Sequence, residues 1–174
     1  MTQSVFFSFQ YDPDNWRVQQ VMNMGAVSGG SAFSPQDWEA VRYKTDAAIE
    51  KWIHEQMNYT KAVIVLVGAT TSKSRWVRHE IIKAWNDKRP LLGVRIHGLR
   101  DKYGYTASRG ADPFASISMT GGGTMANYVE LIDPVDGDSK AVYRDIENNL
   151  EGWVNNRAYR PSCCLLYTSP SPRD

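Results

Sequence analysis

The run Ala62-Val-Ile-Val-Leu-Val67 constrains the fold of this chain more than any other segment. All six residues are apolar and most are β-branched, with no alternating polar position. Such a run is typical of a strand that is buried on both faces, as in the interior of a parallel sheet. Parallel neighbours must be joined by long crossover connections, which are usually helices. We therefore expect an α/β domain with this run as a central strand.

The neighbouring segments supply the other expected elements. Further strands are predicted at Val5–Phe9, 91–96 and 128–132, from their apolar and β-branched composition. Helix starts are predicted at Asp12-Pro13, Ser34-Pro35 and Ser74, where capping residues or proline precede helical spacing. The second of these helical stretches is one helix or two, with a break near Tyr43. The last helix is expected to direct inward Val142, Ile146, Leu150 and Trp153.

Strands that alternate with helices predict a doubly wound, mainly parallel sheet of four to five strands, flavodoxin-like, in a single domain. The first helix should end near Gly25. Residues 98–127 are the exception to the alternation, because this stretch is rich in Gly, Ser and Asp and shows no clear element. Loops of that length are usually functional lids or disordered segments.

Composition excludes several classes of function. The chain has 20 basic and 19 acidic residues among 174, so nucleic acid is not the favoured partner. No apolar run approaches about 20 residues, and the N-terminus lacks the basic start of a signal peptide. We therefore expect a cytoplasmic protein with no membrane partner. The histidines, His54, His79 and His97, show no metal-ligand spacing, so no metal site is predicted.

The C-terminal residues 163–174 differ in character from the rest. They resemble the translation of a sequencing-library adapter, with two Ser-Pro pairs and no periodicity. We therefore expect the domain to span residues 1–162, with a foreign, poorly packed tail after it and the native C-terminus truncated. Both cysteines, Cys163 and Cys164, fall in that tail, which leaves no thiol for disulfides or catalysis in the domain.

Candidate site residues follow from the expected topology. In open α/β sheets, ligands bind beyond the carboxyl ends of the strands, which selects residues 8–10 and 68–74. Glu80 follows on the next helix, about 40° around the helix from Trp76 and about 60° from Val77. This places it at the border of the buried face. Spacing alone favours a surface glutamate that pairs with Lys83 or Arg78, because most charged residues on helices are solvated.

The stretch Ser74-Arg-Trp-Val-Arg-His-Glu-Ile81 resembles the S-x-W-x-x-x-E-L/I motif of TIR (Toll/interleukin receptor) domains. Within that superfamily the chain is most similar to the TIR-like ThsB family of the Thoeris antiphage defence system. The similarity runs in order over about residues 4 to 115, through the stretches Val5–Phe9, 16–18, 45–46, 65–68, 74–83, 100–104 and 110–114. It implies a TIR-like version of the doubly wound fold.

The resemblance also implies an activity. Enzymes of this kind cleave the nicotinamide–ribose bond of NAD and form a cyclic ADP-ribose-type signal that acts on a downstream effector. The motif glutamate, here Glu80, is then catalytic, NAD is the substrate, and no other cofactor is needed. A carboxylate suits this chemistry, because breaking an N-glycosidic bond builds positive charge on the ribose.

Further residues are candidates for substrate binding, each with a simpler alternative. Phe6 and Phe9 would shape the cavity or merely pack in the core. Ser8 would bond ribose or phosphate, or close a turn. Arg17 would contact phosphate or cover the sheet edge, and Asp46 would position a ribose or act near a helix cap. Ser74 and Trp76 complete this set as members of the motif.

The competing hypothesis is a non-catalytic TIR-like module that recruits partners. A receiver-type phosphoacceptor is disfavoured, because the strand ends hold Ser8-Phe9-Gln10 and Val67-Gly68 instead of acidic residues. The enzyme and scaffold hypotheses predict different positions for Glu80. In an enzyme, Glu80 should face a cavity shared with Ser8 or Phe9; in a scaffold it should form an open surface ion pair. Assembly into a homo-oligomer is left open.

Overall fold

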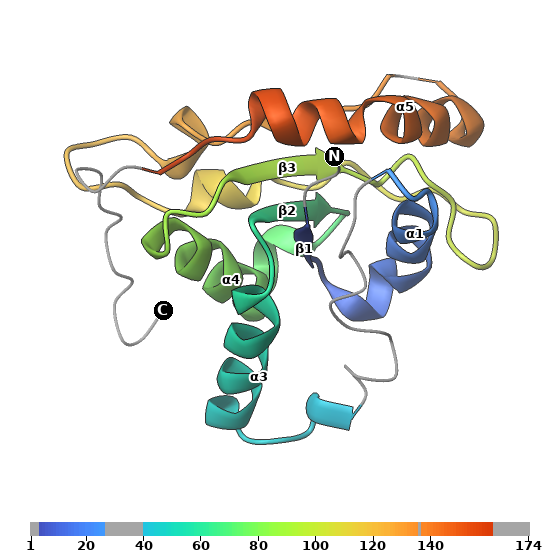
Figure 1. The fold of residues 1–174 in the computed structure, drawn as a ribbon. Coiled ribbons are helices and arrows are strands. Elements are labelled where there is room, and N and C mark those ends of the chain that lie inside the picture. Colours follow the sequence, from blue (N-terminus) through green and yellow to red (C-terminus); the bar gives the residue numbers. More distant parts are fainter. Residues whose placement is uncertain (1–3, 27–39, 136, 162–174) are drawn as a thin grey trace.

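The computed structural model describes residues 4–26, 40–135 and 137–161. In these ranges the chain forms a four-stranded parallel sheet in the order β1-β2-β3-β4 (Figure 1). The strands are β1 (Val5–Ser8), β2 (Ala62–Val67), β3 (Leu91–Arg95) and β4 (Leu131–Ile132). The doubly wound α/β fold is confirmed, and β2 lies between β1 and β3 as its unbroken apolar composition predicted.

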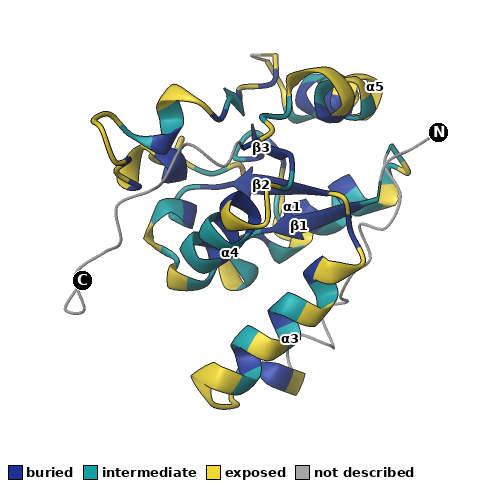
Figure 2. Ribbon diagram, turned by 60° about the vertical axis from the view of Figure 1, so that its left-hand side comes forward, coloured by how far each residue is buried: buried dark blue, intermediate teal, exposed yellow. Residues whose placement is uncertain are grey.

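Helices cover both faces of the sheet. One face packs against α1 (Tyr11–Asn23) and α5 (Ser139–Arg157), and the other against α3 (Asp46–Asn58) and α4 (Arg75–Asn86). Figure 2 shows the strands buried between these layers, with the exposed side of α3 and α5 turned outward. Among the described helices, none is both long and apolar enough to cross a membrane.

The alternation of side chains along β1 divides the core into two parts. Phe6 packs with the α3 and α4 side, whereas Phe7 packs with the α1 and α5 side. Both rings are almost completely buried. Each face of the sheet therefore has its own hydrophobic core, and each contributes to holding the strand ends in place.

The predicted helix starts have mixed outcomes. Ser74 does cap α4, and its Oγ accepts a hydrogen bond of 3.3 Å from the Val77 amide. Of the two alternatives left open for the second helical stretch, the break near Tyr43 is the one observed, because α3 begins only after the Thr45 cap. The predicted Asp12 cap is wrong: Gln10 is the N-cap of α1, and Asp12 and Pro13 lie in its first turn. The predicted start at Ser34 and the tail from Cys163 lie outside the described residues.

The C-terminal half differs in detail from the expectation. The strand expected at 128–132 is only Leu131–Ile132, because a 3₁₀ turn, η3 (Met125–Asn127), keeps the preceding backbone coiled. There the Val129 amide donates to the Met125 carbonyl instead of to a neighbouring strand. In α5 the inward face is as predicted at three positions, but Trp153 is half-buried and Val154 takes the core position.

Residues 98–127 are anchored to the folded core at several positions and do not form a detached lid. Leu99, Phe114 and Met125 are each fully buried, and a second 3₁₀ turn, η2 (Pro113–Ser116), interrupts the stretch. Gly110 fixes it against the end of β2: a Cβ at this position would lie 2.3 Å from the Gly68 carbonyl oxygen. Only glycine permits so close an approach of two backbones.

Candidate active site

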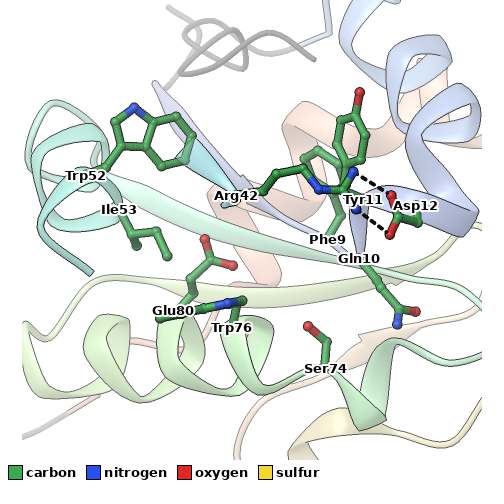
Figure 3. A pocket seen from close by; sticks show the side chains of 10 residues that line it. All are labelled: Phe9, Gln10, Tyr11, Asp12, Arg42, Trp52, Ile53, Ser74, Trp76 and Glu80. Atoms are coloured by element: carbon green, nitrogen blue, oxygen red, sulfur yellow. Dashed lines mark hydrogen bonds and ion pairs between the residues drawn. The ribbon is translucent and has the colours of Figure 1, made fainter. Parts of the chain in front are cut away.

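A cavity of about 250 Å³ opens beside the carboxyl end of β1, between α3, α4 and the start of α1 (Figure 3). It lies where the topology of an open α/β sheet predicts a ligand. Its lining comes from four separate stretches of the chain and consists of Phe9, Gln10, Tyr11, Asp12, Arg42, Trp52, Ile53, Ser74, Trp76 and Glu80.

Glu80 is the buried acid of this cavity. It lies on α4, is only 5% exposed, and directs its carboxyl group into the cavity (Figure 3). The hydroxyl of Ser8, at the end of β1, donates a hydrogen bond of 2.7 Å to Glu80 Oε1. The alternative of a surface pair is not what is observed, because Lys83 pairs with Asp87 and Arg78 bonds the Ser116 carbonyl.

Burial dominates the electrostatics of Glu80. Removal from water raises its pKa from 4.5 to about 8, because the charged form loses hydration, while the hydrogen bond from Ser8 acts in the opposite direction. Most molecules therefore carry a neutral Glu80 at pH 7. A carboxyl group held neutral in a cavity, with a dedicated hydrogen-bond donor, is typical of a functional site.

The walls of the cavity are largely aromatic, and its charges lie at one side. Phe9, Trp52 and Trp76 supply apolar ring surface. On the other side the Arg42 guanidinium makes two parallel hydrogen bonds of 2.9 and 3.1 Å to the Asp12 carboxylate. Arg42 also lies 6.0 Å from the centroid of the Tyr11 ring. The cavity thus combines flat apolar surfaces with one guanidinium.

The start of α4 contributes a further positive potential. Ser74 caps the helix and also lines the cavity, so the first turn of α4 lies at the cavity edge. A helix N-terminus carries a partial positive charge and amides that favour anions. Glu80 follows about 9 Å further along the axis, at 1.5 Å per residue.

The predicted substrate-binding residues divide into two groups. Phe9, Ser74 and Trp76 do line the cavity together with Glu80. Phe6 does not: it is fully buried in the core, so the core-packing alternative describes its position. Ser8 adjoins the cavity through Glu80, with its hydroxyl directed to that carboxylate.

The predicted phosphate contact of Arg17 does not fit the observed position. Arg17 is 4% exposed and does not line the cavity. Its Nε donates to the Leu99 carbonyl (2.8 Å), Nη2 to the Tyr105 carbonyl (2.9 Å), and Nη1 to Asp14 (3.1 Å). The side chain therefore fastens the segment after β3 to α1.

Asp46 also lies outside the cavity lining. It is the first residue of α3, next to the Thr45 cap, and it is exposed. Its carboxylate pairs with Arg75 at the start of α4. This links the two helices that border the cavity, but it does not direct Asp46 toward a ligand.

Six lining residues were not among the predicted substrate-binding residues: Gln10, Tyr11, Asp12, Arg42, Trp52 and Ile53. Gln10 lies in the strand end that the topology rule selects, and Trp52 lies in a stretch with helical spacing, so both had a usable signal. Arg42 had none, because only the fold brings it across from a separate stretch to Asp12, 30 positions earlier.

Comparison with known proteins adds a second line of evidence, which concerns the family of the chain. Residues 6–101, more than half of the chain, match the family model described as the TIR-like domain of the Thoeris protein ThsB. The chain belongs to the ThsB TIR-like family. The matched range contains the whole lining of the cavity.

A relative in this ThsB family comes from Bacillus cereus strain MSX-D12, and it is provisionally named cyclic ADP-D-ribose synthase ThsB1. It is 35% identical over 119 residues, which cover 66% of the present chain and 62% of the relative. The present chain thus spans less than two thirds of the length of this relative.

Proposed function

We propose that the protein cleaves the nicotinamide–ribose bond of NAD, with Glu80 as the catalytic residue, and forms a cyclic ADP-ribose-type product. The observation that carries this proposal is the buried, cavity-facing carboxyl of Glu80, which Ser8 holds in place. The name of the Bacillus cereus relative supports the choice of product.

The size of the cavity is consistent with one end of a dinucleotide. At about 250 Å³ it lies just below the usual volume range of small-molecule sites, so it has room for only part of the substrate. The flat nicotinamide ring and its ribose would enter between the aromatic walls. The rest of the molecule would extend along the start of α4 and past Arg42, where the helix amides and the guanidinium favour its pyrophosphate.

Glu80 then lies where charge develops. As the glycosidic bond breaks, nicotinamide leaves as a neutral base with the bonding electrons, and the ribose acquires oxocarbenium character. A carboxylate beside that ribose stabilises the transition state more than the bound substrate. Nicotinamide is a good leaving group, so the reaction needs no general acid.

The protonation state of Glu80 is part of this mechanism. In the free protein burial keeps it mostly neutral at pH 7, with a pKa of about 8. A bound pyridinium ring brings a positive charge near the carboxyl, which favours its ionised form. We infer that substrate binding is coupled to loss of the Glu80 proton, and that the ionised form is the catalytic one.

The second half of the reaction decides the product. A nucleophile in the adenine-bearing part of the same molecule bonds to the ribose C1′, and one proton is released. Water would give linear ADP-ribose instead. The rings of Phe9, Trp52 and Trp76 limit the room for water around Glu80 and so favour the cyclic product.

The match to a Thoeris family supports a role of this reaction in antiphage defence, where the cyclic product would act on a downstream effector. The competing scaffold hypothesis expected Glu80 in an open surface ion pair. Its burial beside Phe9 supports the enzyme proposal instead.

The decisive experiment incubates the protein with NAD, alone and with lysate from infected cells, and identifies the products by mass spectrometry. We expect nicotinamide and a product that has the mass of NAD less nicotinamide. The Glu80→Gln variant should release little nicotinamide, whereas Glu55→Gln, a charge change on the exposed side of α3, should match the wild type. Absence of NAD turnover under all conditions would favour the scaffold.

A further inference from the structure

A second cavity, of about 200 Å³, lies at the carboxyl ends of β3 and β4 and beneath the start of α5. Figure 1 shows α5 beginning near the carboxyl end of β3. The cavity shares no lining residue with the one that contains Glu80. Its described lining consists of Arg95, His97, Gly98, Arg109, Asp133, Pro134, Val135, Gly137 and Val142.

Arg95 is the anchor of this second cavity. It is the last residue of β3 and is only 7% exposed, which is rare for a guanidinium. Its Nη1 donates to the Gly110 carbonyl at 2.6 Å, and within the described residues this is its one hydrogen bond. A guanidinium has five N–H donors, so most of the donor capacity of Arg95 is not used by the described protein groups.

Two further side chains with donor groups, Arg109 and His97, line the same cavity. Arg109 pairs with Asp133, but this pair is largely in solvent, with side chains 62% and 38% exposed, and such pairs are weak. His97 Nδ1 is buried, and in the described part of the chain it has no hydrogen-bond partner. A buried nitrogen in that state is costly and indicates a missing partner.

The charges around this cavity also favour an anion. Burial lowers the pKa of Arg95, and the neighbouring Arg109 lowers it further, while Asp133 and Asp112 act against this. Burial likewise lowers the pKa of the His97 imidazole. Two guanidiniums thus repel each other across the cavity, and a neutral histidine beside them can donate one N–H.

We propose that this second cavity binds a phosphoryl group, either as free phosphate or as the phosphate of a nucleotide. The planar forks of Arg95 and Arg109 match phosphate oxygens in geometry and charge, and His97 supplies a third donor. Without a ligand, Asp133 pairs with Arg109; on binding, the phosphoryl group replaces the Asp133 carboxylate as the partner of Arg109. The proposal does not depend on the reaction at Glu80, because the two cavities have separate linings.

Isothermal titration calorimetry with the full chain tests this, with inorganic phosphate and AMP as two ligands at constant ionic strength. Arg109→Gln should weaken binding about tenfold, the scale of one charged hydrogen bond. Asp133→Asn should strengthen binding, since it removes the competing carboxylate. Arg157→Gln is the matched control, because Arg157 pairs with Glu130 in a similarly exposed ion pair outside the cavity. This variant should bind both ligands with the affinity of the wild type.

The outcomes separate the sources of the ligand. Tighter binding of AMP that Arg109→Gln weakens would identify a nucleotide phosphate in this cavity, and equal or tighter binding of inorganic phosphate would identify the free ion. The Glu80→Gln variant should bind both ligands as the wild type does, even if NAD turnover is never found. The proposal is overturned if the wild type shows no saturable binding up to millimolar ligand, or if Arg109→Gln and Arg157→Gln weaken binding equally.

Discussion

The Ser8 hydroxyl reaches the Glu80 carboxyl at 2.7 Å, although 72 positions separate the two residues in sequence. Ser8 lies at the end of β1 and Glu80 lies in the second turn of α4, so the contact joins the sheet to the helix that borders the cavity. Both side chains are buried, and the hydrogen bond fixes the direction of a carboxyl group that would otherwise have several rotamers. The geometry of the candidate active site thus depends on a group that need not touch the substrate.

Ser8→Ala tests this positioning role. The hydrogen bond from Ser8 favours the charged form of Glu80, so its loss should raise the Glu80 pKa above its present value of about 8. For the wild type we expect kcat/KM for nicotinamide release to rise with pH and level off above about pH 8, because this parameter reports the free enzyme. For Ser8→Ala the rise should move to higher pH. An unchanged midpoint in a folded variant would contradict the positioning role.

Glu80→Gln tests the catalytic role itself. Glutamine keeps the size of the side chain but cannot become negative, so it should lose the stabilisation of the ribose cation. We expect nicotinamide release to fall at least about a hundredfold, the scale of one preorganised electrostatic contact. Single-turnover release of nicotinamide, measured by chromatography, checks this. Wild-type rates in a folded Glu80→Gln protein would rule out Glu80 as the catalytic residue.

The same substitution should change stability in a direction set by pH. The folded-state pKa of Glu80 lies above its unfolded value of 4.5, so the folded protein binds more protons. The favourable contribution is complete below pH 4.5 and is lost as pH rises to about 8. Relative to Glu80→Gln, the wild type should therefore lose about 1.4 kcal/mol of unfolding free energy per pH unit across this window.

Urea denaturation of both proteins between pH 5 and pH 8 measures that difference. The Glu55→Gln control, on the exposed side of α3, should show no such trend. A constant difference between wild type and Glu80→Gln across the window would show that Glu80 titrates normally in the folded state.

Much of the fold could be predicted from local composition. The unbroken apolar run of β2 indicated a doubly covered strand, and Ser74 indicated the start of α4, because both signals are local. The predictions failed where long-range packing decides. Residues 98–127 lack periodicity, yet Phe114 and Met125 are fully buried there, held by contacts with the sheet and its helices.

The candidate active site shows the same division. The rule for strand ends selected Ser8 and Phe9, and the helical period placed Glu80 near the buried face. The phosphate contact considered for Arg17 does not fit its position in α1, because a charged residue in a helix carries no local signal for which backbone carbonyls it will reach. Arg42 was missed for the same reason, since its approach to Asp12 is a product of tertiary structure alone.

That correction leads to a contrast between two arginines. Arg42 lines the cavity, and it should contact the pyrophosphate of NAD in place of Arg17. Arg42→Gln should raise KM for NAD about tenfold, the scale of one charged hydrogen bond, with little change in kcat, because the phosphates are bound equally in ground and transition states.

Arg17→Gln should act differently. It removes the partner of the buried Asp14 and the bonds to Leu99 and Tyr105, so it should lower the free energy of unfolding by several kcal/mol. Steady-state kinetics and urea denaturation of both variants make the comparison. If Arg17→Gln raised KM while leaving stability intact, and Arg42→Gln left KM unchanged, the pyrophosphate would have to lie on the α1 side of the sheet, and the binding mode proposed here would be wrong.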